Sequence, residues 1–378
     1  MTARVYRSTD RGAPRIAGTT GDLTSWLDAI LLNGYGSQTV TLTRSGSTVT
    51  VTDTGHGLGK CARRLISGAD QAEYNGEFEV TVTGANTYTY QITGTPATPA
   101  TGTITAITPA SGWTIPYTAT NVRVCRPPAG NRFYVRVADT GTGSAAYARV
   151  RGFVNMVDAV EANGTEPFPT DVQFSGGLYI HKSNAVSTTA RAWMAVVTDK
   201  TITLHVAHSG TAQYATYFFG DITTYHAGYS YNTLLIATPS SSNTITLNDY
   251  EVVNTGAATA IPGHYLARNY TNSGTSSAPT KVGGHAISSS GIVGNFGYSY
   301  PSVPDANLLV YNLELATVSS TAMVLIGSIP GVIAPHHNSP LTVGDTFEGV
   351  GEFAGKTYEV RDLATSGSQA FFEISDTF

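Results

Sequence analysis

The sequence predicts a mostly β protein, with an antiparallel β-sandwich or barrel-like main domain, one short N-terminal helix and an inserted small β domain. Charged residues make up 12% of the 378 residues, about half of the ~25% found in an average globular protein. The polar surface therefore comes mostly from Ser, Thr, Asn and Tyr, which are typical of strands and turns. Outside one segment, apolar and polar residues alternate with a period of two, as in strands with one buried face.

The exception is the segment from Thr20 to Asn33, for which we predict a helix. Its apolar residues recur at spacings of three and four and so share one face: Leu23, Trp26, Leu27, Ile30 and Leu31. Thr20 or Asp22 would cap its start, and Asn33–Gly34 would end it in a left-handed conformation. We interpret the apolar face around Trp26 as core or subunit contact rather than as part of a cofactor site.

A self-contained β module is expected at residues 37–109. Thr39–Thr43 and Thr48–Thr52 flank Ser45–Gly46, a pattern typical of a hairpin. A second hairpin is expected around Gly84–Ala85–Asn86, with side chains from its two strands facing each other across one buried surface: Phe78, Val80 and Val82 from one strand, and Tyr88, Tyr90 and Ile92 from the other. The low-complexity stretch after it indicates a linker that leaves the module: TGTPATPATGT.

The flanks of this module indicate an insertion into the main domain. Residues 1–36 would supply an N-terminal strand and the helix, and Ser111–Gly112–Trp113 would resume the same domain. An exposed turn tolerates such an insertion because loop closure costs only ~0.6 kcal/mol more per doubling of loop length. Residues 110–378 would form the main β-rich domain, either as one unit or as two subdomains divided near 240–305.

The main domain is expected to contain strand after strand. Asp199–Lys200 is a two-residue hairpin loop between Arg191–Thr198 and Thr201–Ala207. Further strands are expected in six segments, the last two as a closing pair: Arg132–Ala138, Ala148–Val154, Asn307–Leu315, Met323–Ile329, Thr357–Val360 and Ala370–Ile374. No repeat of 20–50 residues is visible, which argues against a solenoid, a propeller or a β-helix.

The sequence offers little chemistry. It has no G-x-S-x-G, P-loop or H-E-x-x-H motif. His205 and His208 would point to opposite faces of a strand, and His336–His337 has no nearby Cys or carboxylate, whereas zinc needs three or four converging ligands. The carboxylate pairs Asp158/Glu161 and Glu348/Glu352 are not forced into one cleft, as glycoside hydrolysis would require. We therefore expect no catalytic residues, no cofactor, no metal and no enzyme.

Charge and cysteine content exclude further classes. The net charge is −5, with 21 basic and 26 acidic residues and no Lys/Arg cluster, so nucleic-acid binding lacks its electrostatic driving force. No stretch approaches ~18 apolar residues, and the N-terminus has no apolar signal region, so we expect neither a membrane span nor an ordinary signal peptide. Cys61 and Cys125 cannot form a disulfide framework, and we expect two free thiols in a protein made in a reducing cytoplasm, with a single bridge between them as the alternative.

Aromatic residues are the remaining candidates for contacts. Tyr- and Gly-rich loops are expected at 224–231, 264–275 and 283–300. Tyrosine is enriched at protein interfaces, although the same side chains could stack on sugars or remain solvated. The candidate subunit or partner contacts are Trp26, Trp113, Tyr225, Tyr229, Tyr231, Tyr298 and Tyr300.

Two segments of the chain match a known sequence pattern: MTARVYRSTDRGAPRIAGTTGDLTSWLDAILLNGYGS and, after the module, SGWTIPYTATN. The pattern resembles a group of tailed-bacteriophage proteins over nearly the whole chain, including GTEPFPT at Gly164–Thr170 and SGGLYIHKSN at Ser175–Asn184. The resemblance implies a protein of the virion and brings no known activity or site residues with it.

The module is similar to the small, Ig-like β domains that recur in phage structural proteins. The matching residues are His56–Gly57–Leu58, Ser67–Gly68–Ala69, Tyr74–Asn75–Gly76 and Ala85–Asn86–Thr87–Tyr88. The chain departs from that pattern at Cys61 and Arg63–Arg64, where such modules continue with a Gly and an apolar strand. The resemblance therefore does not extend to one strand of the module, or to the edge at which that strand would pair.

These observations lead to one main hypothesis and two alternatives. The chain would be a structural component of a tailed-phage virion, made in the host cytoplasm and assembled as a homo-oligomer with other virion proteins. It would lie on the tail or baseplate, or decorate the capsid. The first alternative is a virion adhesin that binds a host surface glycan through its Tyr/Gly-rich loops. The second is a hydrolase of the cell envelope.

Overall fold

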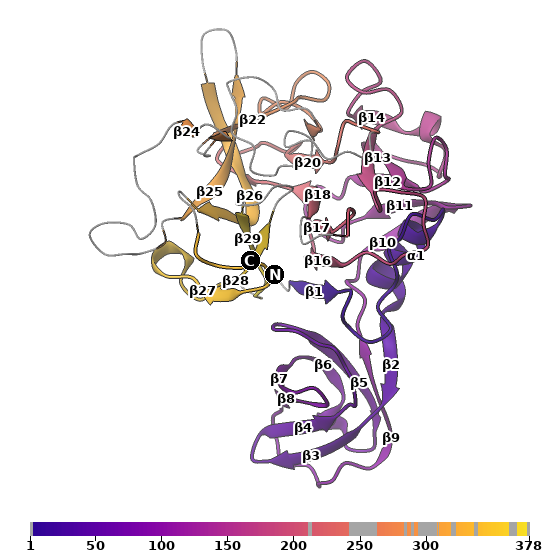
Figure 1. Ribbon diagram of the computed structural model, residues 1–378, viewed down its shortest axis with the longest axis vertical. Helices are drawn as coiled ribbons and strands as arrows, with labels where there is room; N and C mark the ends of the chain where they lie inside the picture. The colour runs from indigo at the N-terminus through magenta and orange to yellow at the C-terminus, as the bar shows by residue number, and fades with distance from the viewer. Residues whose placement is uncertain are drawn as a thin grey trace.

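The computed structural model confirms a mostly β protein with one short helix and several antiparallel sheets (Figure 1). No sheet closes into a barrel within the residues that the structure describes. Those residues are 3–210, 214–241, 263–282, 286–288, 291–293, 308, 310–318, 323–335, 339–362 and 369–375.

The helix forms where its apolar spacing predicts it. It consists of α1 (Asp22–Asp28) and a final π-helical segment, η1 (Ala29–Asn33). Gly34 ends it with a φ of 67°, a conformation that glycine adopts without steric cost. The expected cap at Thr20 or Asp22 is wrong, because no side-chain cap forms locally. The backbone N–H of Leu23 instead donates to Asp139 Oδ2, 2.8 Å away and 116 residues later.

Residues 35–108 form two four-stranded sheets around a core of their own (Figure 1). One sheet contains, in spatial order, β2 (Tyr35–Thr39), β9 (Gly102–Thr108), β5 (Arg63–Ala69) and β6 (Gly76–Glu79). The other contains β3 (Thr41–Ser45), β4 (Thr48–Thr52), β8 (Thr87–Gln91) and β7 (Thr81–Gly84). Between them lie buried apolar side chains that include Leu42, Val49, Val51, Ile66, Tyr74, Tyr88 and Tyr90. This unit is called the module below.

The second expected hairpin of the module is right in part. β7 pairs with β8, but the segment before it, β6, pairs with β5 in the other sheet. Val80 lies at this crossing and is buried, and Phe78 stacks on Tyr90 with ring centroids 4.2 Å apart. Val82, expected to face the buried surface, is 36% exposed. The alternation breaks because the chain changes sheets between Phe78 and Val82.

The main body is built from two further sheets that share one core with the helix. The first sheet has the order β1 (Arg4–Arg7), β16 (Trp193–Val197), β17 (Thr201–Val206), β18 (Ala215–Asp221), β20 (Thr233–Ile236) and β21 (His264–Leu266). The second has β10 (Thr114–Ala119), β11 (Val122–Arg126), β12 (Tyr134–Ala138), β13 (Tyr147–Asn155) and β14 (Thr165–Phe168), with β15 (Leu178–His181) also paired to β13. The predicted hairpin at Asp199–Lys200 joins β16 and β17.

A third sheet packs against the other face of the first sheet through a second apolar cluster. Its strands are β22 (Thr280–Val282), β25 (Val310–Val318), β26 (Met323–Pro335), β29 (Gln369–Glu373), β28 (Thr357–Asp362) and β27 (Thr346–Glu348), and β19 (Thr223–Thr224) pairs with β26. A separate hairpin joins β23 (Ala286–Ser288) and β24 (Gly291–Val293). The predicted closing strand pair is confirmed as β28 and β29.

Candidate contact site braced by arginines

Strand alternation places three arginines on the outer face of the second sheet. In β12 and β13, Val135, Val137 and Val150 enter the core, so that the side chains between them point away from it. These outward residues are Arg136 on β12 and Arg149 and Arg151 on β13, and Arg136 lies directly opposite Arg151 in the antiparallel register. Three cations on one face need acceptors, and the loops that follow β13 and β14 supply them.

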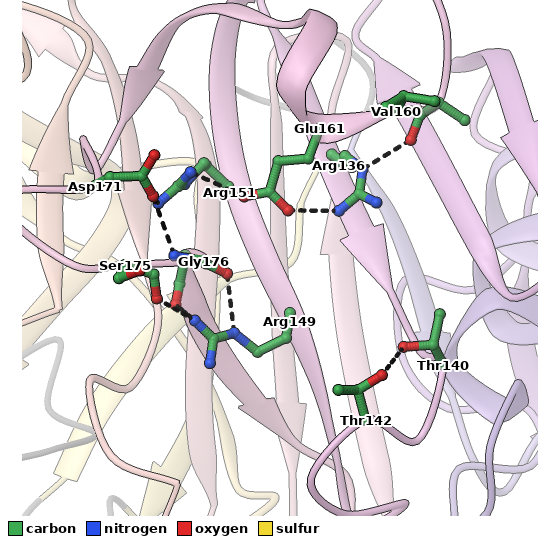
Figure 2. Close-up of polar contacts among 12 residues, drawn as sticks. Arg136, Thr140, Thr142, Arg149, Arg151, Val160, Glu161, Asp171, Ser175 and Gly176 are labelled. Atoms are coloured by element: carbon green, nitrogen blue, oxygen red, sulfur yellow. Dashed lines mark hydrogen bonds and ion pairs between the residues drawn. The ribbon is translucent and has the colours of Figure 1, made fainter.

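Arg151 holds two loops at once, as Figure 2 shows. Its guanidinium side chain is only 4% exposed. Nη1 donates to Glu161 Oε1 at 2.8 Å, and Nη2 donates to Asp171 Oδ1 and to the carbonyl of Phe174, each at 2.7 Å. Because Glu161 and Asp171 belong to different connections, this one side chain fixes the two loops to β13 and to each other.

Arg136 extends the network on the neighbouring strand (Figure 2). Its Nη1 donates to Glu161 Oε2 at 3.0 Å and its Nε donates to the carbonyl of Ala159 at 2.9 Å. Asp158 fixes the same loop from within, because its carboxylate accepts from the N–H of Val160 at 2.8 Å. The loop that joins β13 to β14 is therefore held by both strands beneath it.

Arg149 organises the second loop through carbonyl groups instead of carboxylates (Figure 2). Its Nε donates to the carbonyl of Gly176 at 2.9 Å and its Nη2 to those of Ser175 and Gly177 at 2.6 and 2.5 Å. The guanidinium also lies 4.1 Å from the ring centre of Tyr179, a favourable cation–π geometry. The SGG segment of the chain is thus wrapped around one arginine.

Close packing explains part of the GTEPFPT segment. A Cβ at Gly152 would meet the ring of Phe168 at 2.2 Å, so that only glycine leaves room for this fully buried side chain. Glu166 forms an ion pair with Arg268, which ties β14 to the segment after β21. The segment thereby fixes the edge of the second sheet against the first.

The braced loops present apolar side chains to solvent. Val157, Val160 and Val172 are 60%, 54% and 99% exposed. Val160 directly precedes Glu161, and Val172 directly follows Asp171, so that both valines sit beside residues held by Arg151. An apolar side chain on a rigid loop loses little conformational entropy when a partner covers it. The geometry suits contact with another protein surface.

The electrostatics of this site favour permanent ion pairs over proton transfer. The hydrogen bond from Arg151, followed by that from the Gly176 N–H, lowers the pKa of Asp171 below its ordinary value. A general acid in catalysis needs a raised pKa so that it carries a proton near neutral pH. Asp171 therefore remains a carboxylate and holds its loop.

The module is joined to the body by ion pairs at its base. Glu77 of β6 accepts from Arg4 of β1 at 2.9 and 2.8 Å and from Arg63 of β5 at 2.8 Å. Burial alone would raise the pKa of Glu77, but the hydrogen bonds from the two arginines outweigh it and lower that pKa. Lys60 reaches Glu348 of the third sheet at 2.8 Å.

A second connection lies deeper in the module. Asp53 is fully buried and accepts from Arg11, before the helix, at 2.6 Å and from Arg64 of β5 at 3.3 Å. Arg64 is 1% exposed and also donates to the carbonyl of Ala106 at 3.0 Å. This buried arginine thus connects two strands of the module with the carboxylate that Arg11 binds.

Two predicted contact residues lie in the interior, and their assignment as partner contacts is corrected. Trp26 and Trp113 are each 1% exposed. Trp26 packs edge-on against Trp193 at 5.5 Å between ring centroids, and the indole N–H of Trp113 donates to the carbonyl of Thr198 at 2.7 Å. These side chains hold the helix and the second sheet to the first and leave no surface for a partner.

The predicted tyrosines have different surroundings. Tyr229 is a third candidate that lies in the interior, because it is 5% exposed and packs in the second apolar cluster, so its assignment as a partner contact is corrected too. Its hydroxyl donates to the carbonyl of Arg268 at 2.7 Å. Tyr231 is half-buried beneath the Arg268 guanidinium, 3.9 Å from its ring centre. Tyr225 is 49% exposed. Tyr298 and Tyr300 lie outside the residues that the structure describes.

Three expected absences concern metals, disulfides and membranes. Within the described part of the chain, no group of three or more His, Cys, Asp or Glu side chains is placed to bind a metal ion. Both cysteines are free thiols, Cys125 buried and Cys61 half-buried. No helix among the described residues is long and apolar enough to cross a membrane. His336–His337 lies outside those residues.

Sequence reasoning missed the arginine brace, although a signal was present. Arg149 and Arg151 are two residues apart on a predicted strand and so share a face, in a chain with only 12% charged residues. Asp158 and Glu161 are neighbouring carboxylates in the sequence, but the arginines that bind Glu161 lie on strands whose alignment the sequence does not give.

Comparisons with known proteins give little. No family model and no curated protein sequence matches the chain. Among solved structures, the chain is similar to the phage phi92 endosialidase at 10% sequence identity and a TM-score of 0.17, over 90% of this chain and 52% of that one. The chain thus spans about half the length of the protein it matches. A similarity at this TM-score carries no argument about fold or function.

Proposed function

We propose that this protein is a structural component of a tailed-phage virion that assembles as a homo-oligomer with itself and other virion proteins. Its place is on the tail or baseplate, with capsid decoration as the other location. The observation that carries the proposal is the module, a separately cored β unit that ion pairs fix to the body. Figure 1 shows it extending away from the body, with β3 and β4 at its far end.

A fixed, projecting unit suits a contact arm. A module on a flexible linker would lose orientational freedom when it binds a neighbour, which weakens association. Here Arg4, Arg11 and Lys60 set its orientation before any neighbour arrives. The braced loops with Val160 and Val172 offer a second rigid surface. It lies on the outer face of the second sheet, away from the core.

The use of charge supports the same proposal. Among the described residues, buried or half-buried carboxylates join segments far apart in the chain: Asp139 with Lys182, Asp53 with Arg11 and Arg64, Glu77 with Arg4 and Arg63, and Glu359 with Arg7. Such pairs hold a shape. A neutral surface rich in Ser, Thr and Tyr then allows large contacts with little desolvation cost.

Mass spectrometry of purified particles tests the proposal. Particles of the phage that encodes the chain are separated into heads and tails, and each fraction is digested. We expect peptides of this chain in one of the two fractions, and we expect that fraction to be the tails with their baseplates rather than the heads. Absence from both fractions would overturn the proposal.

A further inference from the structure

We infer that a groove between the first and third sheets is a saccharide-binding site. The groove has a volume of about 600 Å³, within the ~300–1,000 Å³ of small-molecule sites. The side chains that line it include Lys200, Asp221, Thr223, Tyr225, Asn232 and Asn312. The inference goes beyond the proposed function, which does not require any ligand.

Chain topology creates the groove. β18 leaves the first sheet at Asp221, and the next residues form β19, which pairs with β26 of the third sheet through Thr223 opposite Ser328. The chain thus crosses between the two sheets beside the groove, and Lys200 of the β16–β17 turn also lines it.

Two polar side chains of the groove, Asp221 and Asn232, are held in fixed orientations. Asp221 accepts from the Thr233 hydroxyl at 2.6 Å and from the Asn131 N–H at 2.7 Å. Asn232 donates to the carbonyl of Ile222 at 2.8 Å. These hydrogen bonds fix the side chains of Asp221 and Asn232 before a ligand binds, so that binding does not cost the entropy of ordering them.

Tyr225 supplies a fixed aromatic face to the groove. Its backbone N–H donates to the carbonyl of Ile326 at 3.0 Å, and its hydroxyl donates to Glu314 Oε1 at 3.2 Å. The side chain is nonetheless 49% exposed. Pro330 is half-buried and lines the same groove, so that the groove combines apolar surface with hydroxyl and amide groups.

This mixture indicates the class of ligand. A sugar ring presents C–H groups on its faces and hydroxyl groups at its edge, and it needs an apolar plate together with neutral donors and acceptors. Asn312 and Thr223 are exposed in the groove and can provide such groups. Asp221 opposes the positive charge of Lys200, and Lys356 is paired with Glu373 at 3.0 Å. A groove of mixed charge disfavours polyanions such as nucleic acids and favours a polyhydroxyl ligand.

Oligosaccharide binding by the full chain tests the inference. The probe is an array of defined bacterial capsule and O-antigen oligosaccharides, both neutral and uronic-acid-bearing, followed by calorimetric titration of those that bind. Tyr225→Ala and Asn312→Ala should each weaken binding about tenfold or more, which corresponds to ~1.4 kcal/mol. Tyr225→Phe keeps the aromatic face and should weaken binding less than Tyr225→Ala.

A matched control lies on the same sheet. Met323 of β26 is 51% exposed and does not line the groove, so that Met323→Ala should bind as the unaltered chain does. The inference is overturned if no oligosaccharide binds, or if Tyr225→Ala and Asn312→Ala bind as tightly as Met323→Ala. Either result leaves the presence of the chain in heads or tails unaffected, so that failure here is distinct from failure of the proposed function.

Discussion

Replacing Arg151 by alanine should loosen both braced loops. The substitution removes hydrogen bonds to Glu161, Asp171 and the carbonyl of Phe174. Arg136 still binds Glu161, so that this carboxylate keeps one partner. The loops at 156–164 and 170–174 should then become more mobile while the sheet beneath them stays intact, and Arg149 should still hold the carbonyls of residues 175–177.

The magnitude follows from the exposure of each partner. The Asp171 side chain is 71% exposed, so that its ion pair contributes at most ~1 kcal/mol. The Glu161 side chain is 30% exposed, and its charge-assisted bond to the buried guanidinium contributes ~1.5 kcal/mol, the low end for such bonds. The carbonyl of Phe174 adds ~1 kcal/mol. The sum predicts a loss of about 3 kcal/mol in the free energy of unfolding.

Denaturant unfolding combined with hydrogen exchange measures both effects. Arg151→Lys, which keeps the charge but loses the forked geometry, should fall between the alanine variant and the unaltered chain. Arg15→Ala is the control, because Arg15 is 47% exposed in its pair with Asp22 and should contribute at most ~1 kcal/mol. The reasoning is refuted if Arg151→Ala destabilises no more than Arg15→Ala and the loops exchange at unchanged rates.

Four further predictions follow from the same geometry. Asp53→Ala leaves the buried Arg64 guanidinium without its carboxylate and should cost about 3 kcal/mol in calorimetry of the module; an unchanged melting temperature would contradict this. Replacing 38–106 by a short Gly/Ser linker should leave the body folded by circular dichroism, since the main core uses none of these residues; aggregation would count against it. The pKa of Asp171 is lowered on folding, so that its stabilisation is present above the unfolded value of 3.8 and is lost as pH falls through the lower folded value, with faster proteolysis of its loop. Burial raises the pKa of Cys125, so that iodoacetamide should label it only after unfolding.

Local elements could be predicted from the sequence because their signals are local. The helix at 20–33, the turn at Asp199–Lys200 and the closing strands each depend on periodicity or turn chemistry within a few residues. The π-helical end of the helix and the crossing at Val80 carry no such signal. There the packing of distant strands decides the conformation.

Long-range partners could not be predicted for the same reason. The helix cap comes from Asp139, and β1 pairs with β16 almost two hundred residues later. A single sequence shows that Asp139 is a carboxylate but not which N–H it meets. The arrangement of strands in the sheets was likewise undetermined.

The candidate contacts show a more specific difficulty. Trp26 and Trp113 are large aromatic residues, which are enriched both in cores and at interfaces. Residue type alone therefore could not separate the two environments, and both proved to be core. The apolar side chains that are exposed on the braced loops are instead small valines such as Val172, which composition does not distinguish from valines in strands.

Absolute quantification of the chain in intact particles tests the central claim most directly. Banded particles are washed at high salt, and peptides of this chain are counted against those of the major capsid protein. A structural component should remain at a constant ratio of several copies per particle across preparations. Less than one copy per particle, or loss of the chain in the wash, would contradict the account.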